Sequence, residues 1–85
     1  VVLADLNMRP NPSNDLAYIT FNGMESNVAV IVLDAMGRVV YRNNYDVVDG
    51  YKGIWIPTQN LSNGLYQVRI GCGKGVSTLG LQVAH

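Results

Sequence analysis

The sequence predicts an all-β fold in which six or seven short antiparallel strands form two sheets. Three observations favour this class. Runs rich in Val, Ile, Tyr and Thr recur at short intervals, clusters of Gly, Pro, Asn and Asp separate them, and no segment has a convincing helical pattern. Such spacing is typical of a β-sandwich or a small barrel.

Length and composition predict one soluble domain. The chain has 85 residues, enough for a single core that buries roughly 60 to 65% of the surface exposed in the unfolded chain. Its hydrophobic fraction of 48% is too high for disorder. No apolar stretch approaches the ~20 residues of a membrane helix, so we expect no direct membrane insertion. Six basic and six acidic residues cancel without forming a basic stripe, which excludes a nucleic-acid partner.

The first predicted strand lies at residues 1–7, so that residues 1–9 form a linker or a first strand. A polar segment with two prolines, residues 9–15, follows. Because proline fixes φ and disfavours helix, this segment is expected to join its neighbours stiffly. The next strand is predicted at residues 16–22. Its inward side chains are expected to be Ala17, Ile19 and Phe21.

Residues 27–34 are apolar on both faces, which predicts a central strand. The outer face of such a strand needs cover, either from long neighbouring side chains or from an outside partner. We favour the neighbouring side chains. Asp34 suits the first position of a turn and Gly37 suits a positive φ. Residues 34–37 are therefore expected to turn the chain into a hairpin strand at 38–45.

Residues 47–53 are expected to form a loop before a short strand at residues 54–57. In this strand two isoleucines alternate with Trp55. Pro57 cannot donate a ladder hydrogen bond, so it indicates an edge position or the end of the strand.

The last third of the chain predicts one more pair of strands. A turn at 61–64 leads into a strand at 65–70, and a loose loop at 71–75 leads into the last strand at 76–84. The inward residues of these two strands are expected to be Tyr66, Val68, Ile70, Leu79, Leu81 and Val83.

Residues that could carry catalysis or hold a metal are scarce. The only histidine is the terminal His85, and the only cysteine, Cys72, has no activating neighbour in the sequence. The glycine-rich segment 71–75 lacks the spacing of a phosphate loop and precedes a strand. The aspartates are expected to cap turns rather than to bind calcium. They are Asp5, Asp15, Asp34, Asp46 and Asp49. We therefore predict no catalytic residue, no cofactor and no metal site.

One aromatic residue leaves a second function open. Trp55 lies out of phase with the isoleucines beside it, and flat rings on a sheet face stack on sugars. Aromatic residues in a small sandwich more often form core or cross-strand pairs. The alternative function is a non-catalytic carbohydrate-binding or adhesion module of a secreted enzyme.

Three motifs occur in order along the chain. They are an opening Pro10, Asn11 and Pro12; a turn with Asp34, Gly37 and Arg38; and a segment with Leu61, Gly64 and Tyr66. Together they resemble the C-terminal sorting domain of the type IX secretion system, type A, also called the Por secretion system family. Residues 79–84 look like the last strand of that family, so the resemblance spans residues 10–84.

This resemblance implies an Ig-like antiparallel β-sandwich of about seven short strands, with residues 10–85 as the sorting domain. It implies a signal that takes an upstream cargo domain of the same parent chain through the periplasm and across the outer membrane. The implied partners are the outer-membrane translocation machinery and a cell-surface sortase-like protease. The protease removes the domain and joins the cargo to an anionic lipopolysaccharide, or the cargo is released. The sequence leaves a homodimer open.

The last strand is the segment that we expect to contact the machinery. An edge strand or an apolar terminal strand can be recognised through backbone pairing and side-chain pockets. Leu79, Leu81 and Val83 are the candidate recognition residues. The alternative is that these three side chains belong to the core, and both roles can hold together.

Overall fold

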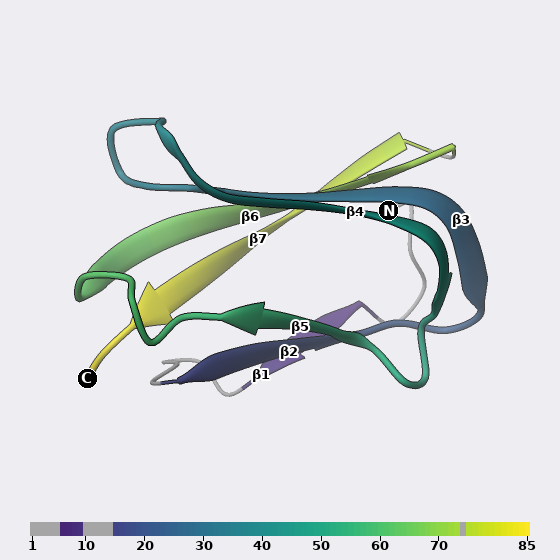
Figure 1. The fold of residues 1–85 in the computed structure, drawn as a ribbon, viewed down its shortest axis with the longest axis horizontal. Helices are drawn as coiled ribbons and strands as arrows, with labels where there is room; N and C mark the ends of the chain where they lie inside the picture. The colour runs from purple at the N-terminus through teal and green to yellow at the C-terminus, as the bar shows by residue number, and fades with distance from the viewer. Residues whose placement is uncertain (1–5, 10–14, 74) are drawn as a thin grey trace.

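The computed structural model describes residues 6–9, 15–73 and 75–85, and these residues form seven strands in two facing sheets (Figure 1). The strands are β1 (Asn7–Arg9), β2 (Leu16–Thr20), β3 (Met24–Leu33), β4 (Val39–Asp49), β5 (Ile54–Pro57), β6 (Gly64–Cys72) and β7 (Gly75–Val83). One sheet has the order β1-β2-β5 and the other β4-β3-β6-β7, with antiparallel pairing throughout. The predicted all-β sandwich is confirmed. No helix long and apolar enough to span a membrane occurs in the described part of the chain.

The core lies between the two sheets and follows the period-two alternation of the strands. Every second side chain of β2, β3, β5, β6 and the end of β7 points inward. Full burial of one such Ile, Leu or Val contributes roughly 1.5–3 kcal/mol. The fully buried aliphatic side chains are Ala17, Ile19, Ile54, Ile56, Val28, Val30, Val32, Val68, Ile70, Leu81 and Val83. The inward residues predicted for the strand at 16–22 are confirmed, since Phe21 is also buried.

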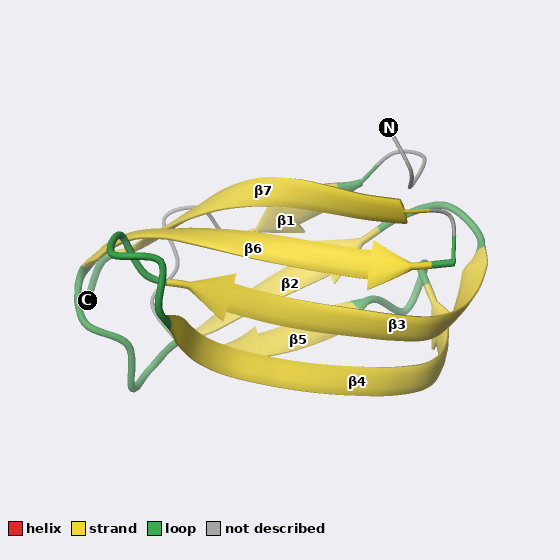
Figure 2. Ribbon diagram, turned by 90° about the horizontal axis from the view of Figure 1, so that it is seen from above, coloured by secondary structure: helices red, strands yellow, loops and turns green. Residues whose placement is uncertain are grey.

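Strand β3 is central, as its two apolar faces predict. It pairs with β4 on one side and with β6 on the other (Figure 2). On its outer face, half-buried Ile31 lies directly opposite Arg42 of β4 and Arg69 of β6. The aliphatic stems of two arginines therefore flank Ile31, which agrees with cover by neighbouring side chains.

Four predicted boundaries are wrong, and one of them is the start of the strand predicted at 27–34, which begins at Met24. The first strand is expected at residues 1–7 but spans Asn7–Arg9. Residues 1–5 lie outside the described residues. The predicted loop at 47–53 starts too early, because Val47–Asp49 still pair with Met24–Ser26 of β3. The predicted loop at 71–75 is mostly strand, because Cys72 pairs with Gly75 across a tight hairpin. In each case a cross-strand partner extends pairing over residues whose local composition favours a loop.

The chain crosses between the sheets three times, and the first two crossings are tied together. The first joins β2 to β3, the second joins β4 to β5, and the third joins β5 to β6. The Phe21 amide donates to the Gly50 carbonyl at 3.1 Å, and the Gly50 amide donates to the Gly23 carbonyl at 2.8 Å. Asp49 caps the second crossing by accepting the Tyr51 amide at 3.0 Å. These hydrogen bonds fix one end of the sandwich.

Candidate functional site

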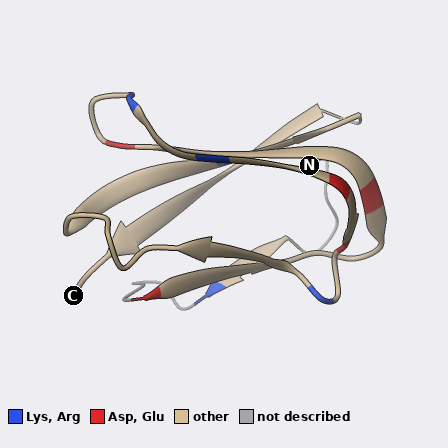
Figure 3. Cartoon of the chain, in the orientation of Figure 1, with Lys and Arg blue, Asp and Glu red and all other residues tan. Residues whose placement is uncertain are grey.

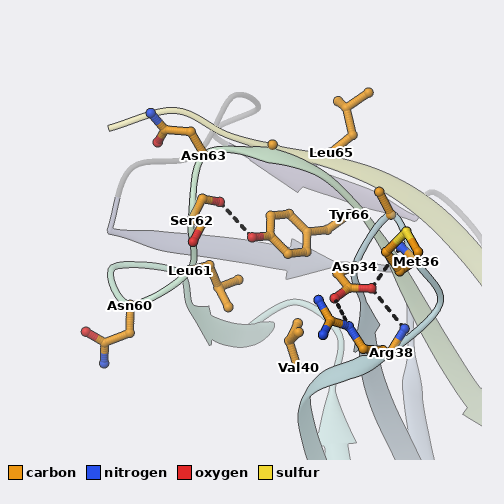
Figure 4. Close-up of a pocket in the computed structure, with 12 residues that line it drawn as sticks. Asp34, Met36, Arg38, Val40, Asn60, Leu61, Ser62, Asn63, Leu65 and Tyr66 are labelled. Atoms are coloured by element: carbon orange, nitrogen blue, oxygen red, sulfur yellow. Dashed lines mark hydrogen bonds and ion pairs between the residues drawn. The ribbon is translucent and has the colours of Figure 1, made fainter.

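Two of the three sequence motifs meet at the other end of the sandwich. The turn between β3 and β4 and the segment that leads into β6 enclose an open hollow of about 560 Å³ (Figure 4). Five motif residues line this hollow: Asp34, Arg38, Leu61, Gly64 and Tyr66. Gly37 lines an adjoining hollow. Pro10, Asn11 and Pro12 lie outside the described residues.

Asp34 organises the β3–β4 turn. Its Oδ1 accepts hydrogen bonds from the amides of Met36 and Arg38, both at 2.9 Å, and its Oδ2 pairs with Arg38 Nε at 2.9 Å. Its carbonyl accepts the Gly37 amide at 3.0 Å, and Gly37 has the predicted positive φ of 84°. The aspartate-x-x-Gly-Arg pattern is thus the sequence of a self-capped turn.

These contacts set the ionisation of Asp34. The hydrogen bond from the Arg38 amide, helped by the Met36 amide and the Arg38 guanidinium, holds the pKa of the Asp34 carboxyl below its ordinary value. Because the folded pKa is the lower one, ionised Asp34 stabilises the folded state above the unfolded pKa. This contribution is lost as the pH falls through the folded pKa.

We expect Asp34→Asn to be less stable than the wild type at pH 7, since the amide keeps a hydrogen-bond acceptor but loses the charge. The difference should shrink as the pH falls through the folded pKa of Asp34, because the wild-type carboxyl then loses its charge. Urea unfolding at several pH values checks this. A difference that stays constant from pH 7 to pH 2 would show that the Asp34 charge does not stabilise the turn.

Tyr66 and Leu61 hold the second motif onto the core. The Tyr66 hydroxyl donates to the Ser62 carbonyl at 2.6 Å, which closes the loop before β6 (Figure 4). Both side chains are half-buried and pack against the core. His85, the second residue after β7, is tied to the same loop: its amide donates to Asn63 Oδ1 at 2.9 Å, and its Nε2 lies 2.7 Å from the Leu61 carbonyl.

The candidate recognition residues of β7 face the core. Leu81 lies opposite Tyr66 and Val83 opposite Gly64, and both side chains are buried. Leu79 is half-buried against the same core. Their strand is nevertheless an edge of the four-stranded sheet. The strand therefore offers a partner its backbone edge and its outward side chains.

The most exposed apolar residues at this end are not among the predicted site residues. Met36 is 81% exposed and Leu65 is 70% exposed, and Leu65 borders three adjoining hollows. Leu65 could have been found from the sequence, since it is apolar yet out of phase with the inward Tyr66. Met36 carries no such signal, because a central turn position has no inward or outward face.

Little in the described residues suggests metal chemistry. They contain no group of three or more His, Cys, Asp or Glu side chains that could hold a metal ion. Cys72 is a free, half-buried cysteine on β6.

Comparison with known proteins first defines the fold. The chain resembles the crystal structure of CopC from Methylosinus trichosporium OB3b with a TM-score of 0.62. The alignment covers 95% of this chain and 90% of that one at 21% sequence identity. At this identity the likeness shows a shared fold. No curated protein matches the chain significantly.

A family comparison then gives the identity that the motifs suggest. The family model described as "Secretion system C-terminal sorting domain" matches residues 7–83, and the chain belongs to that family. It is a C-terminal sorting signal for type IX secretion. Membership implies that the domain is the tail of a larger cargo chain, interacts with the type IX machinery and directs export to the cell surface or secretion. The family is not a catalytic one.

Proposed function

We propose that the type IX machinery recognises the folded domain through the outer edge of β7. The observation that carries this proposal is the position of β7, which pairs only with β6 among the described residues. A partner strand added to this edge would gain affinity from backbone hydrogen bonds and specificity from outward side chains such as Val76 and Thr78. Leu81 and Val83 then serve recognition indirectly, by holding β7 on the core.

The other sheet edges are protected against strand addition. Strand β1 has three residues, and β5 has four and ends at Pro57. Strand β4 carries Arg42 and Asp46, and charged edge residues oppose pairing with another strand. The nine residues of β7 include no charge and no proline. Strand β7 is therefore the long edge best suited to pairing.

The route and the processing of the cargo belong to the same proposal and rest on the family. The parent chain passes through the periplasm, and a cell-surface sortase-like protease separates the cargo from this domain and anchors the cargo. Two copies paired through their β7 edges would form a homodimer, which would hide the edge from the machinery. We therefore expect the free domain to be monomeric in solution.

We expect Val76→Lys combined with Gly80→Lys to reduce secretion of a fused reporter strongly while the domain stays folded. Val76 is 62% exposed, and a Cβ on Gly80 would meet no atom within 4 Å, so neither lysine clashes with the core. The two charges would oppose strand addition at β7. Secretion is measured as reporter in the periplasm, on the cell surface and in the medium. The size of the reporter on an immunoblot shows whether the domain has been removed.

The matched control is Val39→Lys combined with Val47→Lys on β4, where both residues are also exposed. This variant should be secreted like the wild type. Both variants should melt within a few degrees of the wild type, and light scattering should give a monomer. Normal secretion of a folded Val76→Lys, Gly80→Lys variant would contradict recognition through β7. Failure of the wild-type fusion to be exported would instead contradict the sorting role itself.

A further inference from the structure

The outer face of the three-stranded sheet carries an aromatic pair that the proposed sorting role does not explain. Tyr18 of β2 and Trp55 of β5 are direct cross-strand partners. Their ring centroids lie 4.3 Å apart with an interplanar angle of 39°. Their neighbours Ile19, Ile54 and Ile56 are buried, so strand alternation turns the two rings outward. Trp55 is 55% exposed, so its ring is accessible to a ligand on this face.

The pair is held in place before any ligand arrives. The Tyr18 hydroxyl donates to the Lys52 carbonyl. Gly53 lies against the Tyr18 ring, so closely that a Cβ there would be 2.7 Å from Tyr18 Cε1. Tyr18 is thus anchored at its hydroxyl and supported at its edge, and it in turn supports Trp55. A rigid platform spares a ligand the entropic cost of ordering these side chains.

Two cations flank the platform. Arg9 of β1 is the other cross-strand partner of Tyr18, so Arg9, Tyr18 and Trp55 form one row across the sheet. Lys52, whose backbone carbonyl accepts the Tyr18 hydroxyl, is an exposed residue of the loop between β4 and β5. Figure 3 shows basic positions on the side of the three-stranded sheet, and the acidic Asp15 directly precedes β2. Arg9 therefore places a positive charge in the row of the two rings, and Lys52 adds one in the adjoining loop, which Asp49 precedes.

We propose that this face binds an acidic oligosaccharide, with pyranose rings stacked on Trp55 and Tyr18 and carboxylates paired with Arg9 and Lys52. Sugar rings present flat C–H faces that pack on aromatic rings, while their hydroxyls need polar neighbours. The row supplies both kinds of contact, and its cations complement sugar carboxylates. The residues of this site are separate from β7 and from the motif hollow. The proposal therefore does not depend on how the sorting machinery recognises the domain.

The single tryptophan gives a direct readout. Hexagalacturonate is titrated into the 85-residue chain at low salt while Trp55 fluorescence is followed. The matched neutral probe is the fully methyl-esterified hexamer, which keeps the same rings without the charges. We expect saturable binding of both, about three- to ten-fold tighter for the acid, since each exposed ion pair contributes modestly. This difference should shrink in 0.5 M NaCl, where such pairs are screened.

Substitutions test whether the oligosaccharide binds to the row of Arg9, Tyr18 and Trp55. Arg9→Gln should weaken acid binding about three-fold and leave the methyl ester unchanged. Arg42→Gln, a matched change on the opposite sheet, should alter neither. Tyr18→Leu should weaken both probes at least ten-fold, and its melting curve checks that it is folded. The proposal is overturned if the acid gives no saturable signal at millimolar concentration, if the methyl ester binds as tightly at low salt, or if Arg9→Gln has no effect. A dimer seen by light scattering, with Trp55 shielded from a soluble fluorescence quencher, would also overturn it.

Discussion

Removal of residues 79–85 is expected to abolish cooperative unfolding and, with it, secretion of a fused cargo. The deletion takes away the fully buried Leu81 and Val83. It also exposes the edge of β6 from Gly64 to Val68, which β7 pairs in the native sheet. Burial of the two side chains alone contributes roughly 3–6 kcal/mol. A chain of this length has a total stability of roughly 4–13 kcal/mol, so the remaining structure is not expected to persist.

Circular dichroism during heating checks the first part of this prediction. The control is removal of residues 84–85, which are exposed and follow β7. This shorter deletion loses the contacts of His85 with Asn63 and Leu61 but no core side chain, so it should keep a sharp transition. A cooperative transition in the chain without residues 79–85 would mean that β7 is not integral to the sandwich.

A milder change separates folding from recognition. Leu81→Ala leaves β7 in place but opens a cavity, which costs about 2–5 kcal/mol. If the machinery contacts the backbone edge of β7, secretion should follow the folded fraction of this variant and recover at lower temperature. If the machinery inserts Leu81 into a pocket of its own, secretion should stay low even where the variant is folded. The burial of Leu81 favours the first outcome.

The sequence predicts the strands well where one face is continuously apolar. Ala17, Ile19 and Val30 lie at inward positions by simple alternation, and all three are fully buried. The central position of β3 follows from its two apolar faces in the same way. Here burial and local pattern agree, so no knowledge of the partner strands is needed.

Strand ends and spatial neighbours could not be predicted in this way. Val47–Asp49 are strand because Met24–Ser26 lie opposite them, and no local pattern reveals that pairing. The contact of His85 with Leu61 joins residues 24 apart in sequence. The β3–β4 turn was predicted correctly because Asp34 and Gly37 determine it locally, but its meeting with the Leu61–Tyr66 segment depends on the packing of the whole sandwich.

Replacing Gly53 by alanine is expected to be one of the most damaging single substitutions, and Gly37→Ala shows how much of the damage is backbone strain. Both glycines have a positive φ, 82° at Gly53 and 84° at Gly37. An alanine in this conformation costs about 1–2 kcal/mol. A Cβ on Gly37 would meet nothing within 4 Å, so the cost there should stop at this value.

At Gly53 a steric cost is added. The new Cβ would lie 2.6 Å from the Ile19 carbonyl oxygen and 2.7 Å from Tyr18 Cε1. Neither group can yield easily, because Ile19 is paired within the sheet and the Tyr18 hydroxyl is bound to the Lys52 carbonyl. Overpacking of this kind costs about 1–3 kcal/mol, which brings the expected total to about 2–5 kcal/mol.

Urea unfolding of the two variants measures this difference, and Trp55 fluorescence locates it. Because the Tyr18 ring lies against Trp55 in a tilted arrangement, displacement of Tyr18 in Gly53→Ala should shift the native emission, whereas Gly37→Ala should leave it unchanged. Equal losses of stability in the two variants would mean that the chain around Gly53 relaxes freely. The Tyr18–Trp55 platform would then be a flexible surface, and the crossing from β4 to β5 would not be the rigid support that its hydrogen bonds indicate.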